Sequence, residues 1–144
     1  GYRQALADHH IPEIPRDICL SETERDDTQI YEFENGRAAA TYFIDMEDRP
    51  TGYVCVNDMT ALGAIRTFQS AGLSVPQDVS LIGFDNIPYS EISSPRLTTI
   101  DQCTYDMGSL STRMLVESIE EPKKPHSSIT LEPTLVERDS VRTL

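Results

Sequence analysis

Short apolar runs and longer stretches of helical periodicity alternate along this chain. The run at 81–84 is continuous rather than alternating, which is typical of a strand covered on both faces, although a run this short does not exclude a helix. Together the apolar runs predict extended segments over residues 18–21, 52–56, 81–84, 98–100, 128–131 and 135–137.

Apolar residues recur at helical spacing between these runs. Ala61, Ile65 and Phe68 mark one face of a helix that follows the N-cap candidate Asn57 and ends at Gly72, a residue that suits a helix C-terminus. The same spacing predicts further helices, so that the full set covers residues 1–9, 34–47, 59–71 and 105–120.

This order of strands and helices predicts the class of fold. Helices that connect parallel strands form right-handed crossovers. We therefore predict an α/β fold with three layers around a mainly parallel sheet. With 144 residues, of which 38% are hydrophobic and 25% charged, the chain is expected to form one domain with one core.

Two features bear on the protein's setting. No apolar run approaches the roughly 18 residues that a membrane span needs, and the first residues, G-Y-R-Q-A-L, lack the apolar core of a signal peptide. We therefore expect a cytoplasmic protein with no membrane contact. The chain also opens inside a helical pattern and without a methionine, so we expect a fragment of a longer protein.

The charge of the chain argues against direct contact with nucleic acid. Its 24 acidic and 12 basic residues give a formal net charge of −12, whereas proteins that hold nucleic acid neutralise phosphates with clustered Lys and Arg. If the whole protein binds DNA, a separate module must make the contact.

The cysteines and histidines form no recognisable ligand set. The cysteines lack a CxxC pair or a His partner, so we predict buried free thiols, and the histidines likewise lack metal-ligand spacing. No metal and no cofactor are predicted. The residues concerned are Cys19, Cys55, Cys103, His9, His10 and His126.

Polar side chains follow three of the predicted strands. Asn57, Asp85 and Gln102 stand where these strands end, and ligands of parallel sheets bind at the carboxyl ends of the strands. A carboxylate accepts hydrogen bonds and an amide both donates and accepts, so the set suits the vicinal hydroxyls of a sugar or polyol. The structural alternative is that Asn57 caps its helix, Asp85 ties down its own loop and Gln102 binds backbone groups.

Several motifs in a fixed order resemble a known family. The chain contains N-D-x-x-A-x-G at 57–63, P-x-D-V-S-x-I-G-F-D at 76–85, P-x-L-T-T-I at 95–100 and L-V-E-R-D-S at 135–140. Each motif is weak alone, but together they resemble the sensor domain of LacI/GalR transcription repressors. The resemblance runs from Gly1-Tyr2 to Ser140.

The resemblance implies an architecture. In this family the sensor is built like a type I periplasmic sugar-binding protein, with two α/β subdomains that close on a small effector, and a helix-turn-helix module binds the operator. The chain resembles the C-terminal subdomain, nearly whole. Half of the effector cleft and the DNA-binding module are therefore expected to lie outside it, so the fragment alone should bind effector poorly and operator DNA not at all.

The resemblance also implies which residues contact the effector. The family's contacts carry over to Asn57, Asp85 and Gln102, and Tyr31 matches a position where relatives carry an aromatic that stacks on the ligand. The alternative for Tyr31 is a half-buried residue leading into the helix. Thr104 stands where some sugar-responsive relatives have an aromatic, which bears on the size of the ligand.

The mechanism that the resemblance implies is allosteric. An effector, expected to be a sugar or sugar derivative, would change the orientation of the two subdomains and so move paired DNA-reading modules of a homodimer. Dimer contacts would fall on the helix at 59–71 and the loop at 87–95, with Leu62 and Ile92 as candidates. Ordinary core packing is the alternative for both residues.

Three other functions compete with this one. An enzyme is disfavoured, because the chain has no Gly-rich phosphate loop, no G-x-S-x-G elbow and no His with a well-spaced acidic partner. A periplasmic-type sugar-binding protein of a transporter shares the fold. A regulator with a phosphoprotein corepressor would need a basic surface, for which Arg66, Arg96 and Arg113 are the candidates.

Overall fold

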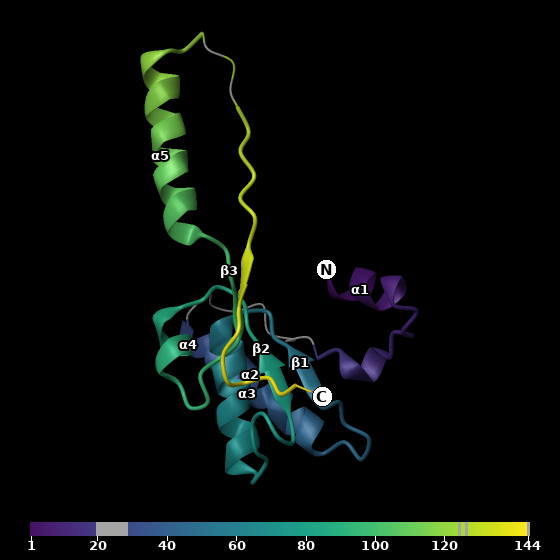
Figure 1. Cartoon of the computed structure of the whole chain (residues 1–144). Helices are drawn as coiled ribbons and strands as arrows, with labels where there is room; N and C mark the ends of the chain where they lie inside the picture. Colours follow the sequence, from purple (N-terminus) through teal and green to yellow (C-terminus); the bar gives the residue numbers. More distant parts are fainter. Residues whose placement is uncertain (20–28, 124, 126, 144) are drawn as a thin grey trace.

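The computed structural model of the chain describes residues 1–19, 29–123, 125 and 127–143, and it describes the backbone but not the side chains of 29–31. Its elements follow one another along the chain as shown in Figure 1. They are α1 (Tyr2–Asp8), the 3-10 turn η1 (Pro15–Asp17), α2 (Gln29–Ile44), β1 (Gly52–Val54), α3 (Asp58–Ser70), β2 (Ser80–Ile82), α4 (Pro88–Ile92), β3 (Thr99–Asp101), α5 (Thr104–Glu120) and β4 (Thr134–Val136).

The strands pair in both directions: β1, β2 and β3 run parallel, and β4 runs antiparallel to β3. β1 pairs with β2 in parallel, with Tyr53 opposite Leu81, and a parallel bridge between Ile82 and Thr98 continues towards β3. β4 then pairs with β3 in the antiparallel direction. The α/β class and the mainly parallel pairing predicted from the sequence are confirmed.

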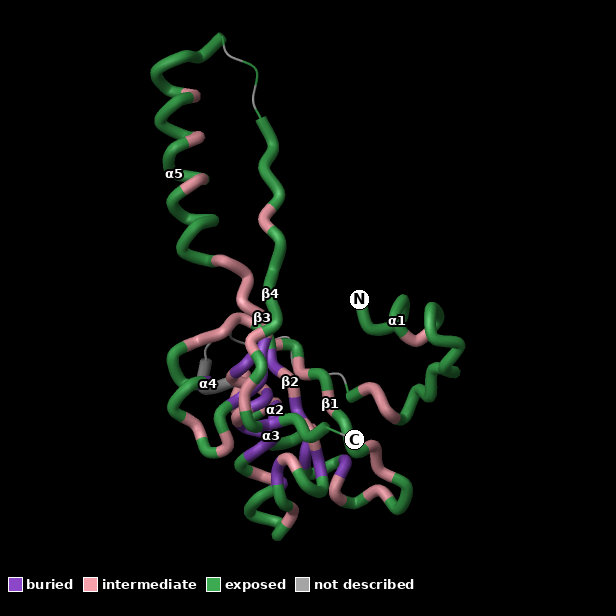
Figure 2. The backbone as a smooth tube through the Cα atoms, viewed as in Figure 1, coloured by how far each residue is buried: buried purple, intermediate pink, exposed green. Residues whose placement is uncertain are grey.

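The core lies between α2, α3 and one face of the β1–β2 pair, and most of the residues coloured as buried in Figure 2 lie there. The ring of Tyr53 contacts the rings of Phe43 and Phe68, with centroids 4.9 and 5.2 Å apart. Val54, the next residue of β1, points to the opposite face of the pair and is 71% exposed. α2 and α3 thus cover one face of the sheet, and the other face is open at Val54.

Two glycines allow α2 and α3 to lie unusually close together. A Cβ atom on Gly36 would lie 1.9 Å from the backbone oxygen of Thr60, and one on Gly63 would lie 2.0 Å from that of Phe33. Any larger residue at either position would therefore push the two helices apart.

The ends of α3 confirm the capping predictions. Asn57 is its N-cap and accepts a hydrogen bond from the backbone N–H of Thr60 at 2.9 Å. Gly72 follows the helix with a φ of +85°, a conformation that glycine adopts without steric penalty.

Three local predictions were wrong or only partly right. The helix predicted at 34–47 is α2, which begins at Gln29 and ends at Ile44. The predicted loop at 87–95 contains the short helix α4, which Pro88 opens in the first helical position that proline favours. Half of the predicted strand at 18–21 lies outside the described residues, Ile18 and Cys19 are not in a strand, and Cys19 is exposed rather than buried.

α5 and the extended segment 127–133 form an arm that rises from the body in Figure 1. No residue of α5 is buried, and Leu115, Val116 and Ile119 are among its exposed apolar side chains. Because β3 leads directly into α5, the arm leaves the sheet at the carboxyl end of β3. In the part of the chain that the structure describes, no helix is long and apolar enough to cross a membrane.

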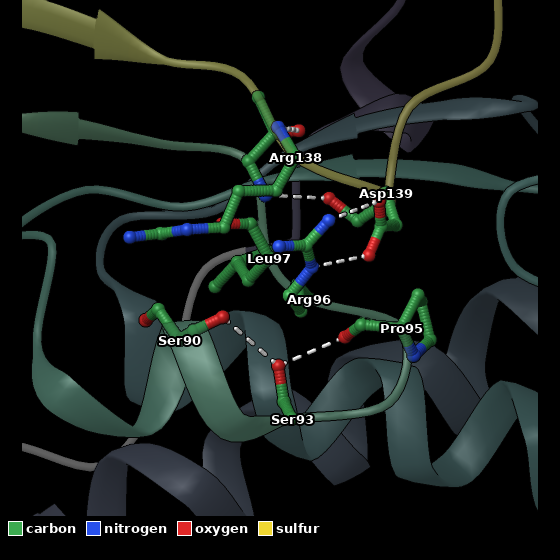
Figure 3. Close-up of polar contacts among 9 residues, drawn as sticks. Ser90, Ser93, Pro95, Arg96, Leu97, Arg138 and Asp139 are labelled. Carbon is green, nitrogen blue, oxygen red and sulfur yellow. Dashed lines mark hydrogen bonds and ion pairs between the residues drawn. The ribbon is translucent and has the colours of Figure 1, made fainter.

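The C-terminal segment returns from the arm and is fixed to the body. Arg96 donates to both carboxylate oxygens of Asp139, at 2.7 and 3.1 Å, as Figure 3 shows. The fully buried Ser140 donates its hydroxyl to the Leu81 carbonyl at 2.7 Å and accepts from the Thr98 N–H at 2.8 Å. These bonds hold the segment against β2 and β3.

Candidate functional site

Asp85 and Gln102 meet where β2 and β3 end. Asp85 follows β2, and its backbone N–H donates to the Ile100 carbonyl at 2.9 Å, which aligns the loop with β3. The Gln102 side chain then donates from Nε2 to Asp85 Oδ1 in a short hydrogen bond. The structure thus brings together two of the residues predicted to form the site, and Gln102 binds a side chain rather than backbone groups.

Asn57 lies at the end of the neighbouring strand, β1. The backbone N–H of the next residue, Asp58, donates to the Phe84 carbonyl at 2.9 Å, so Asn57 and Asp85 stand on adjoining connections. Because Asn57 Oδ1 caps α3, the structural alternative for this residue is correct. Its Nδ2 amide has no partner among the described residues, so the cap leaves a donor for a ligand.

Tyr31 is the fourth predicted site residue. Its backbone belongs to the first turn of α2, but its side chain lies outside the described part of the structure. Its role in stacking on a ligand therefore stays a prediction.

The environment of Asp85 raises the pKa of its carboxyl group above the ordinary value. Burial is the main cause, the negative charge of Asp58 adds to it, and the hydrogen bond from Gln102 opposes it. Asp85 also has a φ of +116°, which is rare for a residue with a side chain. A partly desolvated carboxylate on a strained backbone is typical of residues that serve function rather than stability.

A second polar network beside the site was not predicted. Asn86, with a φ of +53°, donates from Nδ2 to Asp101 Oδ2 at 2.9 Å and accepts from Arg138 Nη2 at 2.7 Å. Asp101 Oδ1 also accepts from the Cys103 N–H at 2.7 Å. The bond from Asn86, together with that from Cys103, lowers the pKa of Asp101.

This network ties the loop after β2 to both connections of the arm. Asp101 ends β3, which enters the arm, and Arg138 follows β4, which leaves it. The sequence could have indicated a turn at Asn86, since asparagine tolerates a positive φ after a strand. It could not have indicated the hydrogen-bond partners of Asn86, because they are distant in sequence.

The described residues offer no alternative centre for metal binding, and Cys55 is not a reactive thiol. No group of three or more His, Cys, Asp or Glu residues among them is arranged to hold a metal ion. Burial raises the pKa of the Cys55 thiol to about 12, with a further contribution from the charge of Asp58, so this thiol is neutral at pH 7.

The two residues predicted at a dimer contact line a common surface hollow. Leu62 lies on α3 and Ile92 on α4, and Ile92 is 76% exposed. The hollow has a volume of about 270 Å³, and it is lined by Phe33, Met59, Leu62, Tyr89, Ile92 and Ser93.

Comparison with known proteins agrees with this geometry. The family described as "Periplasmic binding protein-like domain" matches residues 1–141. The ribose operon repressor of Haemophilus influenzae is 33% identical over 144 residues, which cover 100% of this chain and 41% of that repressor. The HTH-type transcriptional repressor PurR of Photobacterium profundum is 40% identical over 114 residues, covering 79% of this chain and 34% of its own length.

Solved structures give the same picture. A LacI family transcriptional regulator from Enterococcus faecium, with bound ribose, has a TM-score of 0.83 and 30% identity over 99% of this chain and 49% of its own. A LacI-type regulator from Bifidobacterium animalis has a TM-score of 0.82 and 32% identity over 99% of this chain and 49% of its own. The chain therefore spans less than half the length of these proteins.

Proposed function

The chain belongs to the periplasmic binding protein-like family, as the sensors of LacI-type regulators do, and we propose that it is the effector-sensing part of such a transcription regulator. The observation that carries the proposal is the side-chain pair Asp85–Gln102, which stands beside Asn57 at the carboxyl ends of adjoining strands. The relatives named as repressors support the regulatory role.

The chemistry of the three residues supports a ligand rich in hydroxyl groups. Asp85 Oδ2 has no partner among the described residues and can accept a hydrogen bond from a ligand hydroxyl, while Asn57 Nδ2 can donate one. Two LacI-family relatives contain bound ribose, and a regulator named CelR was solved with cellobiose. We therefore expect a sugar or sugar derivative as effector, with Tyr31 stacking on its apolar face.

We further propose that this chain is mostly the C-terminal subdomain of the sensor. The exposed apolar side chains on α5 would then pack against the remaining half, since relatives are more than twice as long as the matched region. That half would complete the effector cleft between the two subdomains. The isolated chain is accordingly expected to bind effector poorly.

The intact regulator is proposed to work as a homodimer. The apolar hollow between α3 and α4, with the exposed Ile92 at its rim and Leu62 in its lining, suits a contact with a second copy. Effector binding would change the orientation of the subdomains and so the spacing of two DNA-binding modules that lie outside this chain. The acidic chain itself, with a net charge of −12, would stay off the operator.

A phosphoprotein corepressor is a weaker alternative. The three arginines proposed for a basic patch come from different parts of the molecule, with Arg66 on α3, Arg113 on the arm and Arg96 in the loop before β3. Arg96 is also paired with Asp139. A transporter's sugar-binding protein shares the fold, but the relatives named as repressors favour regulation.

The experiment that tests the proposal is a thermal-shift screen of the intact protein against sugars, sugar phosphates and purines, followed by operator-binding assays with each ligand that stabilises it. A ligand that raises the melting temperature and also changes operator affinity would support an effector-gated regulator. A protein that is stabilised by a sugar but never binds DNA would instead be a sugar-binding protein of another kind.

A further inference from the structure

Asp58 opens α3 with a carboxylate that is fully buried. Oδ2 accepts hydrogen bonds from the Ile87 N–H at 2.9 Å and the Ser90 hydroxyl at 2.6 Å, and Oδ1 accepts from the Thr99 hydroxyl. In the described part of the chain, no basic side chain forms an ion pair with it. A buried charge without a counter-ion is costly, so these donors and the N-terminus of α3 must compensate for lost hydration.

The Asp58 carboxylate packs against the backbone of residue 83, and it has room there because residue 83 is a glycine. A Cβ atom on Gly83 would lie 2.1 Å from Asp58 Oδ1 and 2.9 Å from Leu97 Cδ2. The position of the Asp58 side chain is thus set by the backbone of Gly83, which directly follows β2, and by its three hydrogen-bond donors.

Asp58 holds both ends of the segment that carries Asp85. Its backbone N–H binds the Phe84 carbonyl, and its side chain binds the Ile87 N–H. Between these two anchors lie Asp85 and Asn86, with φ angles of +116° and +53°. Consecutive residues in such conformations persist only where their surroundings fix them, so Asp58, together with Gln102 and the Ile100 carbonyl, fixes where the Asp85 carboxylate points.

The same carboxylate also fixes α4. Ser90 is fully buried, its hydroxyl binds Asp58, and its carbonyl accepts from the Leu97 N–H at 2.8 Å. Tyr89 precedes Ser90 on α4 and Ile92 follows two residues later, and both line the apolar hollow beside Leu62. One buried side chain therefore joins the loop of the candidate effector site to the surface proposed for dimerisation.

We propose that Asp58 is a positioning residue that couples the effector loop at 84–87 to the α4 surface. The inference rests on the proposed function, because it concerns the same effector site and the same dimer surface. A shift of the loop on effector binding would reach α4 through Oδ2, and by linkage a change at α4 would alter effector affinity. This coupling needs no contact between Ser90 and the effector.

The test is a substitution on the α4 side, Ser90→Ala, in the intact protein, with Ser70→Ala as the matched control. Ser70 ends α3, the helix that Asp58 opens, and its hydroxyl binds the Arg66 carbonyl at 2.8 Å and not Asp58. Loss of a hydrogen bond to a buried carboxylate should weaken binding of the stabilising ligand about tenfold in S90A, while S70A stays within about twofold. Equal affinities in S90A and the unsubstituted protein, or equal losses in both variants, would overturn the proposal.

Amide hydrogen exchange without ligand gives a second readout that does not depend on knowing the effector. In S90A, peptides covering 84–87 should exchange faster along with those covering α4, whereas in S70A the 84–87 region should be unchanged. Unchanged exchange at 84–87 in S90A would refute the coupling. If no sugar, sugar phosphate or purine stabilises the unsubstituted protein, the sensor proposal fails, and the exchange measurement still decides the role of Asp58.

Discussion

The Gln102 side chain donates a hydrogen bond to Asp85 and so joins the carboxyl ends of two strands that are distant in sequence. The bond leaves Asp85 Oδ2 with no partner among the described residues, while burial disfavours the ionised form of the group. The pair therefore presents a carboxylate that is oriented but only partly satisfied. A ligand hydroxyl would supply the missing donor, which is the physical basis for placing the effector here.

Substitution of Gln102 should make Asp85 a weaker acid. In Gln102→Ala the bond that favours the charged form is lost, while burial and the charge of Asp58 remain, so the pKa of Asp85 should rise further above its ordinary value. Carbon-13 NMR titration of the Asp85 carboxyl group would measure this. Gln69→Ala is the control, because Gln69 binds a backbone carbonyl, that of Ser94, and no acid. An unchanged Asp85 titration in Q102A would mean that the two side chains do not pair in solution.

Asp85→Asn should weaken effector binding strongly without destabilising the protein at neutral pH. A raised pKa in the folded state means that Asp85 contributes stability below its unfolded-state pKa and loses that contribution as the pH rises through its folded-state pKa. The neutral amide avoids this loss, so D85N should be at least as stable as the unsubstituted protein at pH 7. The difference should vanish as the solution is acidified.

Chemical denaturation between pH 4 and pH 8, paired with ligand titration, would check both parts of this prediction. Ligand affinity should fall about 10- to 100-fold, the value of a hydrogen bond to a charged group. A D85N protein that binds ligand with unchanged affinity would disprove the assignment of Asp85 to the effector site.

The sequence predicted those elements in which the apolar periodicity repeats over several turns and capping residues mark the ends. α3 is the best case, because Asn57 and Gly72 mark its ends and Phe68 its buried face. α2 ends three residues before its prediction, at Ile44, where Asp45 and Glu47 would have placed acidic groups at the negative end of a helix. α4 was missed because five residues are too few to establish a period.

The site was predicted as far as it depends on strand ends, and no further. Asp85 and Gln102 lie together because both follow parallel strands, a relationship that sequence order reveals. Asp58 would be taken for an exposed acid in the first turn of a helix. It is buried because Ser90 and Thr99, which are 32 and 41 residues away in sequence, fold over it.

The close approach of α2 and α3 predicts a strong effect of adding one methyl group. Gly36→Ala and Gly63→Ala each place a Cβ atom about 2 Å from a backbone oxygen of the other helix, so each should lower the free energy of unfolding by about 1–3 kcal/mol. Gly108→Ala in α5 is the control, since no atom lies within 4 Å of its Cβ position. That variant should be neutral or more stable by up to about 1 kcal/mol. Equal urea midpoints for G63A and G108A would contradict the observed packing.

Cys55 and Cys19 should differ in their reactivity towards alkylating agents. At a pKa of about 12, Cys55 has a thiolate fraction of ~0.01% at pH 8, and its side chain packs against the core. Cys19 is exposed and should be labelled first. Peptide mass spectrometry after a timed reaction with iodoacetamide would compare the two, with a urea-unfolded sample as reference. Labelling of Cys55 at the rate of Cys19 in the folded protein would show that the β1 end opens readily.

Ile92→Glu should separate the proposed dimer into monomers while preserving the fold. Ile92 is 76% exposed, so a carboxylate there meets water in the monomer, but in a dimer it would be buried against the apolar hollow beside Leu62. The dimer dissociation constant should rise about 30-fold or more, the effect of losing a well-packed anchor residue. Sedimentation velocity of the intact protein over a concentration series would measure this. Val141→Glu, at another exposed apolar position that does not line the hollow, should leave association unchanged. Because α4 binds Asp58 through Ser90, a variant that dissociates should also bind effector more weakly, whereas a dimer held elsewhere on the molecule would survive I92E intact.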